Sequence, residues 1–317
     1  MPESSARLCP VSPMEQFFAT HSYCVLEVGS ADGLTAVEAQ HWARLFDVDR
    51  ATPGWHVAQP VQQQESSSRR GPGGRDITAF GWTDKGGTRE QMINGDVLLT
   101  SPVFDGLIRH PKIIAAVERL MGGKCALAET CLRHMMPFDG REHEPYQRWH
   151  RDGPLGDGKG WSGQPPRRFR AEYLQAMVLL SDTDESTHCF SLSPEPCGGE
   201  VLPSDPSETG GMQVAQRGAL NMHGPTGTVV LLNLSTLHTA TARITTKERK
   251  TLQTYYGHAG GRTLSQFTCV PPALWRDHPD EACRAFYSGI PLNDKSRAVL
   301  SLPFHVLQPP GTKTPRL

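Results

Sequence analysis

The residues best suited to chemistry lie together near the middle of the chain, where His150 and Asp152 are two positions apart. On an extended strand, alternate side chains point to the same face, so the imidazole and the carboxylate are expected to converge on one point. Two histidines and one carboxylate form the facial triad of non-haem Fe(II) oxygenases. The pair alone is weak support, because a histidine near an aspartate is often only a hydrogen-bonded structural pair. A second histidine must come from elsewhere in the chain.

His238 is the best candidate for that second histidine among the thirteen in the chain. It follows an apolar strand expected at 228–234 and a short polar turn, which would place it at the mouth of a barrel. His223 is the next best candidate, although it is expected in a loop. His134 could reach inward from its strand, but a hydrogen-bonded core histidine is the commoner outcome. His188 and His258 lie in or beside loops and could approach a pocket.

Arg249 follows His238 by eleven residues, at the start of the next expected strand. A guanidinium there could bind a cosubstrate carboxylate through two parallel hydrogen bonds. Taken alone, an arginine in the charged turn 247–250 is more simply a surface residue. Its distance from His238 favours the functional interpretation.

The composition favours a β-rich globular protein. The 317 residues include 26 prolines and 31 glycines, which indicate many turns and long loops. A formal net charge of −1 provides no excess of positive charge for binding nucleic acid or an anionic membrane. The eight cysteines form no C-x-x-C pair and follow no secretion signal, which predicts reduced thiols and a cytoplasmic protein. No stretch approaches the roughly 18 apolar residues of a membrane span.

Short strands joined by long Gly/Pro-rich connections predict a mainly β fold, a sandwich or jelly roll with flanking helices. A capping box at Thr35–Glu38 and Pro111 before an apolar face predict the first residues of two helices. Strands are expected at 23–28, 125–136, 171–181, 228–234, 251–256 and 265–270, and further helices at 111–121 and 280–287. We expect a single domain over 1–317, with a core of about 14–290 and flexible segments at 60–75 and 309–317.

The pattern of His150, Asp152, His238 and Arg249 resembles that of the phytanoyl-CoA dioxygenase family of Fe(II)/2-oxoglutarate-dependent oxygenases. The resemblance extends over about residues 14–257. It also includes the segments 17–28, 101–104, 110–111 and 174–182. The full pattern in this order is specific, whereas each part alone is not.

The resemblance implies a double-stranded β-helix (a cupin-like jelly roll) with Fe(II) near one mouth. His150, Asp152 and His238 would be the metal ligands and the catalytic centre. 2-Oxoglutarate would chelate iron through its keto acid end, with its distal carboxylate on Arg249, and O2 would take the last position. In the family, oxidative decarboxylation to succinate and carbon dioxide is coupled to removal of a substrate hydrogen.

The chain departs from the family pattern at two places. Ala240 stands where members often carry a Ser or Thr that helps to bind the distal carboxylate. Thr239, Thr241 or Tyr255 could substitute. The segment 191–196 replaces the usual Pro-Gly-Ser-His run. Retention of Asp152 argues against the halogenase branch, where a small residue frees the position for halide.

Several further residues are candidates for the pocket. Met177 and Gln175 share a strand face and could line the cosubstrate site, although a core role for Met177 is at least as compatible. Arg133 could bind a substrate carboxylate. Lid candidates lie in the Gly/Pro-rich loop 153–170, where solvated or packing roles fit equally well: Trp161, Arg168 and Arg170.

These features predict an oxygenase that removes hydrogen from a small carboxylated or otherwise anionic metabolite in a biosynthetic pathway. Hydroxylation, desaturation or oxidative ring closure, for example a kainoid-type cyclisation, would all fit. We expect a monomer with no nucleic-acid or membrane partner. One alternative is a non-catalytic jelly-roll protein that binds metal or ligand, in which 2-oxoglutarate would not bind. The other is a 2-oxoglutarate-independent cupin metalloenzyme, whose O2 consumption would not need that cosubstrate.

Overall fold

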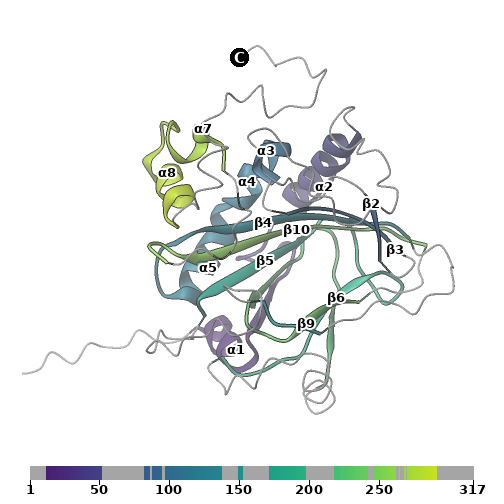
Figure 1. Ribbon diagram of the computed structural model, residues 1–317. Helices are drawn as coiled ribbons and strands as arrows, with labels where there is room; N and C mark the ends of the chain where they lie inside the picture. Colours follow the sequence, from purple (N-terminus) through teal and green to yellow (C-terminus); the bar gives the residue numbers. More distant parts are fainter. Residues whose placement is uncertain are drawn as a thin grey trace, which may run out of the picture.

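Two antiparallel sheets form the framework of the protein and face each other (Figure 1). The computed structural model describes residues 12–51, 82–85, 88–94, 97–137, 149–152, 171–197, 218–241, 246–261, 264, 268 and 270–290. The segments 60–75 and 309–317 and the lid candidates Trp161, Arg168 and Arg170 lie outside these residues. The predicted mainly β jelly roll with flanking helices is confirmed.

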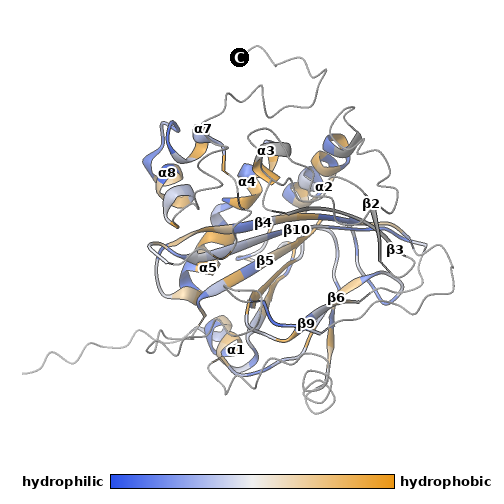
Figure 2. Cartoon of the chain, in the orientation of Figure 1, coloured by the Kyte–Doolittle hydropathy of each residue, from blue (hydrophilic) through white to orange (hydrophobic). Residues whose placement is uncertain are grey.

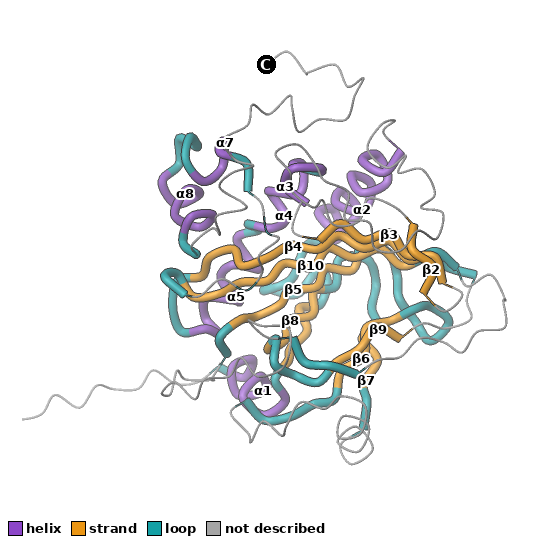
Figure 3. The backbone as a smooth tube through the Cα atoms, viewed as in Figure 1, coloured by secondary structure: helices purple, strands orange, loops and turns teal. Residues whose placement is uncertain are grey.

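The larger sheet has seven strands in the order β1-β8-β5-β10-β4-β3-β2. Their bounds are β1 (Tyr23–Leu26), β8 (Val229–Asn233), β5 (Tyr173–Leu179), β10 (Arg249–His258), β4 (Cys125–Met135), β3 (Thr88–Asn94) and β2 (Trp82–Lys85). The smaller sheet has the order β7-β6-β9 and consists of β7 (Leu220–Met222), β6 (Cys189–Leu192) and β9 (His238–Thr241). Figure 3 shows the two sheets on opposite sides of a common interior.

Five of the six expected strands are present, with ends shifted by a few residues. The strand expected at 265–270 is wrong at the two residues described there, because neither Thr268 nor Val270 lies in a strand. Thr268 instead donates a side-chain hydrogen bond to the carbonyl of Ala128 in β4, at 3.0 Å.

Helices cover the outer face of the larger sheet (Figure 1). They are α2 (Ala36–Ala51), α3 (Val97–Thr100), α4 (Asp105–Ile108), α5 (Pro111–Met121), α7 (Pro272–Trp275) and α8 (Glu281–Ser288), with a 3-10 turn at Pro102–Phe104. A further helix, α1 (Pro13–His21), precedes β1. Apolar residues on these helices pack against alternate residues of the sheet, such as Leu252 of β10 and Val178 of β5. Figure 2 shows apolar residues along the strands beneath the helices and hydrophilic residues on the outer helical surfaces. In the part of the chain that is described, no helix combines the length and apolar character needed to cross a membrane.

The helix ends follow the local sequence signals. α5 begins at Pro111 and ends where Gly122 adopts a left-handed conformation, as predicted. The expected capping box is present at α2: the backbone N–H of Glu38 donates to Thr35 Oγ1 at 3.2 Å, and the N–H of Thr35 donates to Glu38 Oε2 at 2.8 Å.

The interior between the sheets is apolar on one side and polar along β10. The apolar part is formed by Met177, Leu179, Val230 and Leu232 of the larger sheet and by Phe190, Leu192 and Met222 of the smaller one. Alternate residues of β10 face the same interior and are buried: Arg249, Thr251, Gln253 and Tyr255. Burial of polar side chains is costly unless they have partners, and within this row Gln253 and Tyr255 are joined by a hydrogen bond.

Candidate metal and cosubstrate site

His150, Asp152 and His238 converge as their spacing predicts. Their ligand atoms all lie within 4.8 Å of one another. Asp152 Oδ1 is 3.5 Å from His150 Nε2, and Asp152 Oδ2 is 3.4 Å from His238 Nε2. In the described part of the chain, no other group of three His, Cys, Asp or Glu residues is close enough to hold a metal ion.

The two histidines are joined through their backbones. His150 and His238 form an antiparallel bridge, in which each N–H donates to the other residue's carbonyl at 2.9 Å. The rings consequently lie beside each other, with centroids 4.4 Å apart. This bridge connects the segment that carries Asp152 to the first residue of β9.

The orientation of His238 is set by its surroundings. Its Nδ1 donates to the carbonyl of Thr236 at 2.8 Å, so the lone pair is on Nε2, which faces Asp152. The ring is buried, and the centroid of the Phe190 ring lies 5.2 Å away. The side chains of His150 and Asp152 are 39% and 36% exposed, so the cluster has an accessible side.

Asp152 is poised to remain ionised. Burial raises the pKa of its carboxyl, but the interactions with His238, His150 and Arg133 more than offset that effect. Its pKa therefore lies below its ordinary value. A deprotonated carboxylate with two imidazoles is the donor set that Fe(II) prefers, so these residues fit the metal.

Arg249 is the first residue of β10 and is only 1% exposed. Thr251 follows it on the same face, between Leu179 of β5 and Arg133 of β4. The Thr251 hydroxyl is fully buried and has no hydrogen-bond partner among the described residues. A guanidinium and a hydroxyl donor thus lie side by side in the interior, where they could bind a carboxylate.

A chain of hydrogen bonds continues along the same interior face. Gln175 Nε2 donates to Gln253 Oε1 at 3.0 Å, and the Tyr255 hydroxyl donates to the same oxygen at 3.3 Å. Gln253 Nε2 contacts Met177 Sδ at 3.8 Å. Burial, and then the negative charge of Asp152, hold the pKa of Tyr255 well above its ordinary value, so its hydroxyl remains a donor.

The remaining histidines that the sequence offered have other roles. His134 bonds to Glu248 Oε2 at 2.6 Å and lies edge-on to Phe46 beneath the helices. His188 donates to the carbonyl of Met136 at 2.9 Å, and His258 donates to that of Ala171 at 3.2 Å. His223 lies in a loop, as expected.

Two of the predicted substitutes for the residue missing at Ala240 already donate to acceptors within the protein. Thr239 Oγ1 donates to the carbonyl of Ala240 at 3.3 Å, and Tyr255 donates to Gln253. The side chain of Thr241 lies outside the described residues. Sequence reasoning did not single out Thr251. Its position two residues after Arg249 on a strand could have indicated that both side chains point to the same face.

Arg133 is half-buried on the interior face of β4, opposite Thr251. Its positive charge acts on both Asp152 and Tyr255, which indicates that it lies near the metal ligands. The structure thus brings Arg133 to the expected region.

A jelly roll with two histidines and an aspartate between its sheets is the arrangement of a non-haem iron oxygenase. The model of the family Phytanoyl-CoA dioxygenase (PhyH) matches residues 35–251, and the chain belongs to this family. It is therefore a dioxygenase of the iron- and 2-oxoglutarate-dependent class. No curated protein sequence matches the chain significantly.

Several solved structures share the fold. EctD from S. alaskensis, solved with 2-oxoglutarate and 5-hydroxyectoine, is 18% identical with a TM-score of 0.55, covering 85% of each chain. The α-ketoglutarate-dependent epimerase SnoN from nogalamycin biosynthesis is 18% identical, with a TM-score of 0.52, over 78% of this chain and 82% of its own. The carbocyclase SnoK from the same biosynthesis is 16% identical, with a TM-score of 0.52, over 78% and 83%.

Proposed function

We propose that this dioxygenase oxidises a small anionic metabolite, with His150, Asp152 and His238 as its Fe(II) ligands and catalytic centre. The observation that carries the proposal is the convergence of these three residues, whose ligand atoms lie within 4.8 Å of one another. When bound there, Fe(II) and 2-oxoglutarate supply the oxidising power from O2, with succinate and carbon dioxide as the products of the cosubstrate.

Arg249 and Thr251 would bind the distal carboxylate of 2-oxoglutarate. A guanidinium suits a carboxylate because it can donate two parallel hydrogen bonds, and the Thr251 hydroxyl on the same strand face provides a further donor. Met177 and Gln175 would line the pocket, since both are buried and connect to Gln253 on the same interior face.

The substrate would lie on the accessible side of the metal ligands. Arg133 supplies a positive charge that acts on Asp152, which favours a substrate with a carboxylate or another anionic group. Trp161, Arg168 and Arg170 remain predicted substrate contacts in the loop that follows Asp152. Within this role the chain's own residues bind and orient the substrate and keep water from the reacting carbon.

The outcome of the reaction is left open between hydroxylation, desaturation and ring closure in a biosynthetic pathway. Neighbours of the same fold bear the names epimerase and carbocyclase, so this fold accommodates more than one outcome. A kainoid-type cyclisation is one candidate that fits an anionic substrate.

Succinate formation tests the function. The full chain would be mixed with Fe(II), 2-oxoglutarate, O2 and a panel of carboxylate-containing metabolites, and succinate and O2 consumption would be measured. We expect succinate formation that depends on Fe(II), is stimulated by some panel members and is lost in His150→Ala. His134→Gln, which alters a histidine bonded to a carboxylate outside the site, should retain it.

Two results would contradict the proposal. Iron-loaded protein that forms no succinate above background and does not bind 2-oxoglutarate would indicate a non-catalytic binding protein. O2 consumption that is independent of 2-oxoglutarate would indicate a cupin metalloenzyme of another kind.

A further inference from the structure

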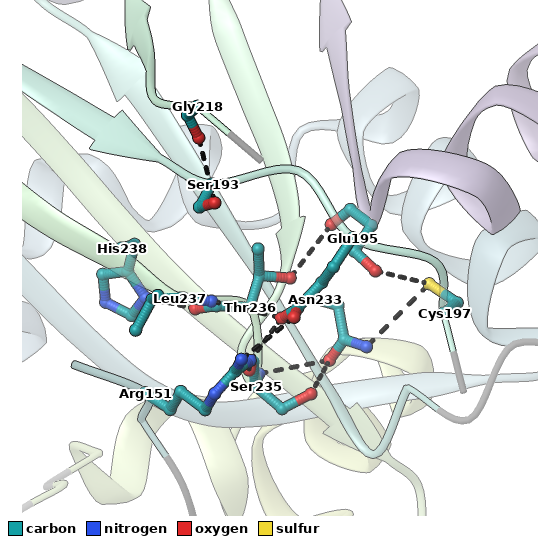
Figure 4. Close-up of polar contacts among 11 residues, drawn as sticks. Arg151, Ser193, Glu195, Cys197, Gly218, Asn233, Ser235, Thr236, Leu237 and His238 are labelled. Atoms are coloured by element: carbon teal, nitrogen blue, oxygen red, sulfur yellow. Dashed lines mark hydrogen bonds and ion pairs between the residues drawn. The ribbon is translucent and has the colours of Figure 1, made fainter. Parts of the chain in front are cut away.

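Arg151 lies between two proposed metal ligands, His150 and Asp152, and its guanidinium makes a two-point contact of its own. Alternation along an extended segment directs it away from the metal side. It bonds to both carboxylate oxygens of Glu195, with Nη2 to Oε2 at 2.9 Å and Nη1 to Oε1. Nη1 also donates to the carbonyl of Ser235. Figure 4 shows Arg151 directed toward Glu195 and toward the turn that leads to His238.

Glu195 extends this contact to the other ligand segment. Its Oε1 accepts from the backbone N–H of Leu237, the residue before His238, at 3.3 Å. Ser193, near Glu195, donates its backbone N–H to the carbonyl of Leu237 at 2.9 Å. Glu195 is itself held, because its N–H donates to the carbonyl of His21 at the end of α1, at 3.3 Å.

The turn before His238 is therefore held at successive residues. Asn233 Oδ1 accepts from the N–H of Ser235 at 3.2 Å, and the N–H of Thr236 donates to the carbonyl of Asn233 at 2.8 Å. The carbonyl of Thr236 then fixes the ring of His238 through Nδ1. Arg151 and Glu195 bind this turn at Ser235 and Leu237, on the two sides of that carbonyl.

The Arg151–Glu195 pair is buried, with side chains 9% and 13% exposed. A buried ion pair is a poor way to gain stability, because desolvation offsets much of its attraction. Its planar two-point geometry is strict, so such a pair is better suited to fixing direction and distance. Here it connects the segment of His150 and Asp152 to the turn of His238.

We propose that Arg151 and Glu195 are positioning residues that hold the two ligand segments in register and thereby set the affinity of the metal site. The inference rests on the proposed function of the three ligands. Neither residue contacts the metal in this account. Interactions of this outer kind typically change metal affinity by about 10–100-fold.

The test measures Fe(II) affinity of the full chain under anaerobic conditions, together with the visible charge-transfer absorption that appears when 2-oxoglutarate joins bound Fe(II). Arg151→Lys keeps the charge but loses the two-point contact. Glu195→Gln keeps the size of the side chain and an acceptor for Leu237. Each is expected to weaken Fe(II) binding about 10–100-fold and to alter the absorption band. The double variant should lose little more than either single variant, because both break one connection.

The control is the Arg109–Asp105 pair at the end of α4, another two-point contact, in which Arg109 Nε and Nη2 donate to the two carboxylate oxygens at 2.8 and 2.6 Å. Arg109→Lys should lower the melting temperature while leaving Fe(II) affinity unchanged. If Arg151→Lys does not fold, Glu195→Gln carries the same test, because it retains the volume and the backbone acceptor.

The outcomes separate this inference from the proposed function. If His150→Ala abolishes Fe(II) binding while Arg151→Lys and Glu195→Gln bind as the wild type does, the positioning role is wrong. A fall in melting temperature alone, as in Arg109→Lys, would likewise overturn it. If His150→Ala itself binds Fe(II) normally, the proposed metal site is wrong instead.

Discussion

Among single residues, Thr251 offers the sharpest test of the cosubstrate pocket. Thr251→Val preserves the shape of the side chain and removes the hydroxyl that would bind the distal carboxylate of 2-oxoglutarate. A hydrogen bond to a charged group is worth roughly 1.5 kcal/mol or more, so the KM for 2-oxoglutarate should rise about tenfold or more. The melting temperature should not fall, because the hydroxyl has no partner among the described residues in the free protein.

Thr254→Val provides the control on the same strand. Thr254 is buried on the opposite face of β10, where it interacts with Tyr256, so its loss should affect stability without changing the KM for 2-oxoglutarate. An unchanged KM in Thr251→Val would remove Thr251 from the pocket.

The residues of the site differ in how far sequence could predict them. His150 and Asp152 could be paired because a strand has a period of two, and Arg249 could be placed by its distance from His238. Thr251 was missed because threonine is common in strands for structural reasons, so its presence there does not indicate a binding role. The contact of Arg151 with Glu195 joins residues 44 positions apart, and no local pattern predicts such a partner.

At the level of helices, the capping box of α2 gives a dependence of stability on pH. Hydrogen bonds from the backbone and side chain of Thr35, with a further one from His110, lower the pKa of Glu38 from 4.5 to about 2. Ionised Glu38 thus stabilises the folded state above pH 4.5, and this contribution is lost as the pH falls toward 2. The melting temperature of Glu38→Gln should lie below that of the wild type at neutral pH, and the two should converge near pH 2. A difference that does not vary with pH would contradict this assignment.

The turn before β8 shows how closely α2 packs on the sheet. Gly227 has a φ of +95°, and a Cβ there would lie 2.3 Å from the Cβ of Ala39 in α2. Gly29 has a similar φ of +80°, with nothing within 4 Å of an added Cβ. Gly29→Ala should lower the free energy of unfolding by about 1–2 kcal/mol, because alanine is strained at a positive φ. Gly227→Ala should lower it by at least about 1 kcal/mol more, because the added Cβ also clashes with Ala39. Equal losses in denaturant unfolding would show that the packing is not tight.

The elements whose ends carry clear sequence signals were the most predictable. Pro111 and Gly122 bound α5 at the predicted residues, because proline suits a first helical turn and glycine adopts the left-handed conformation at its end. The segment 265–270 carries apolar and β-forming residues without such signals. Its described part follows a tertiary contact, the hydrogen bond of Thr268 to β4, rather than a strand.

For the whole molecule, the order of strands is the part that local sequence cannot supply. β1 pairs with β8, with Tyr23 opposite Leu232, and β10 lies between β5 and β4. The resemblance to a family implied a double-stranded β-helix, but it did not specify which strands pair. The single-domain boundary and the monomeric state remain predictions.

The central claim is that one Fe(II) binds at His150, Asp152 and His238, and that 2-oxoglutarate then binds beside Arg249. Anaerobic titration of the full chain with Fe(II), followed by 2-oxoglutarate, tests it through metal stoichiometry and the visible charge-transfer absorption. We predict one Fe(II) per chain in the wild type, none retained in His150→Ala, and normal Fe(II) but at least tenfold weaker 2-oxoglutarate binding in Arg249→Ala. Stoichiometric Fe(II) binding by folded His150→Ala with an unchanged absorption band would contradict the account.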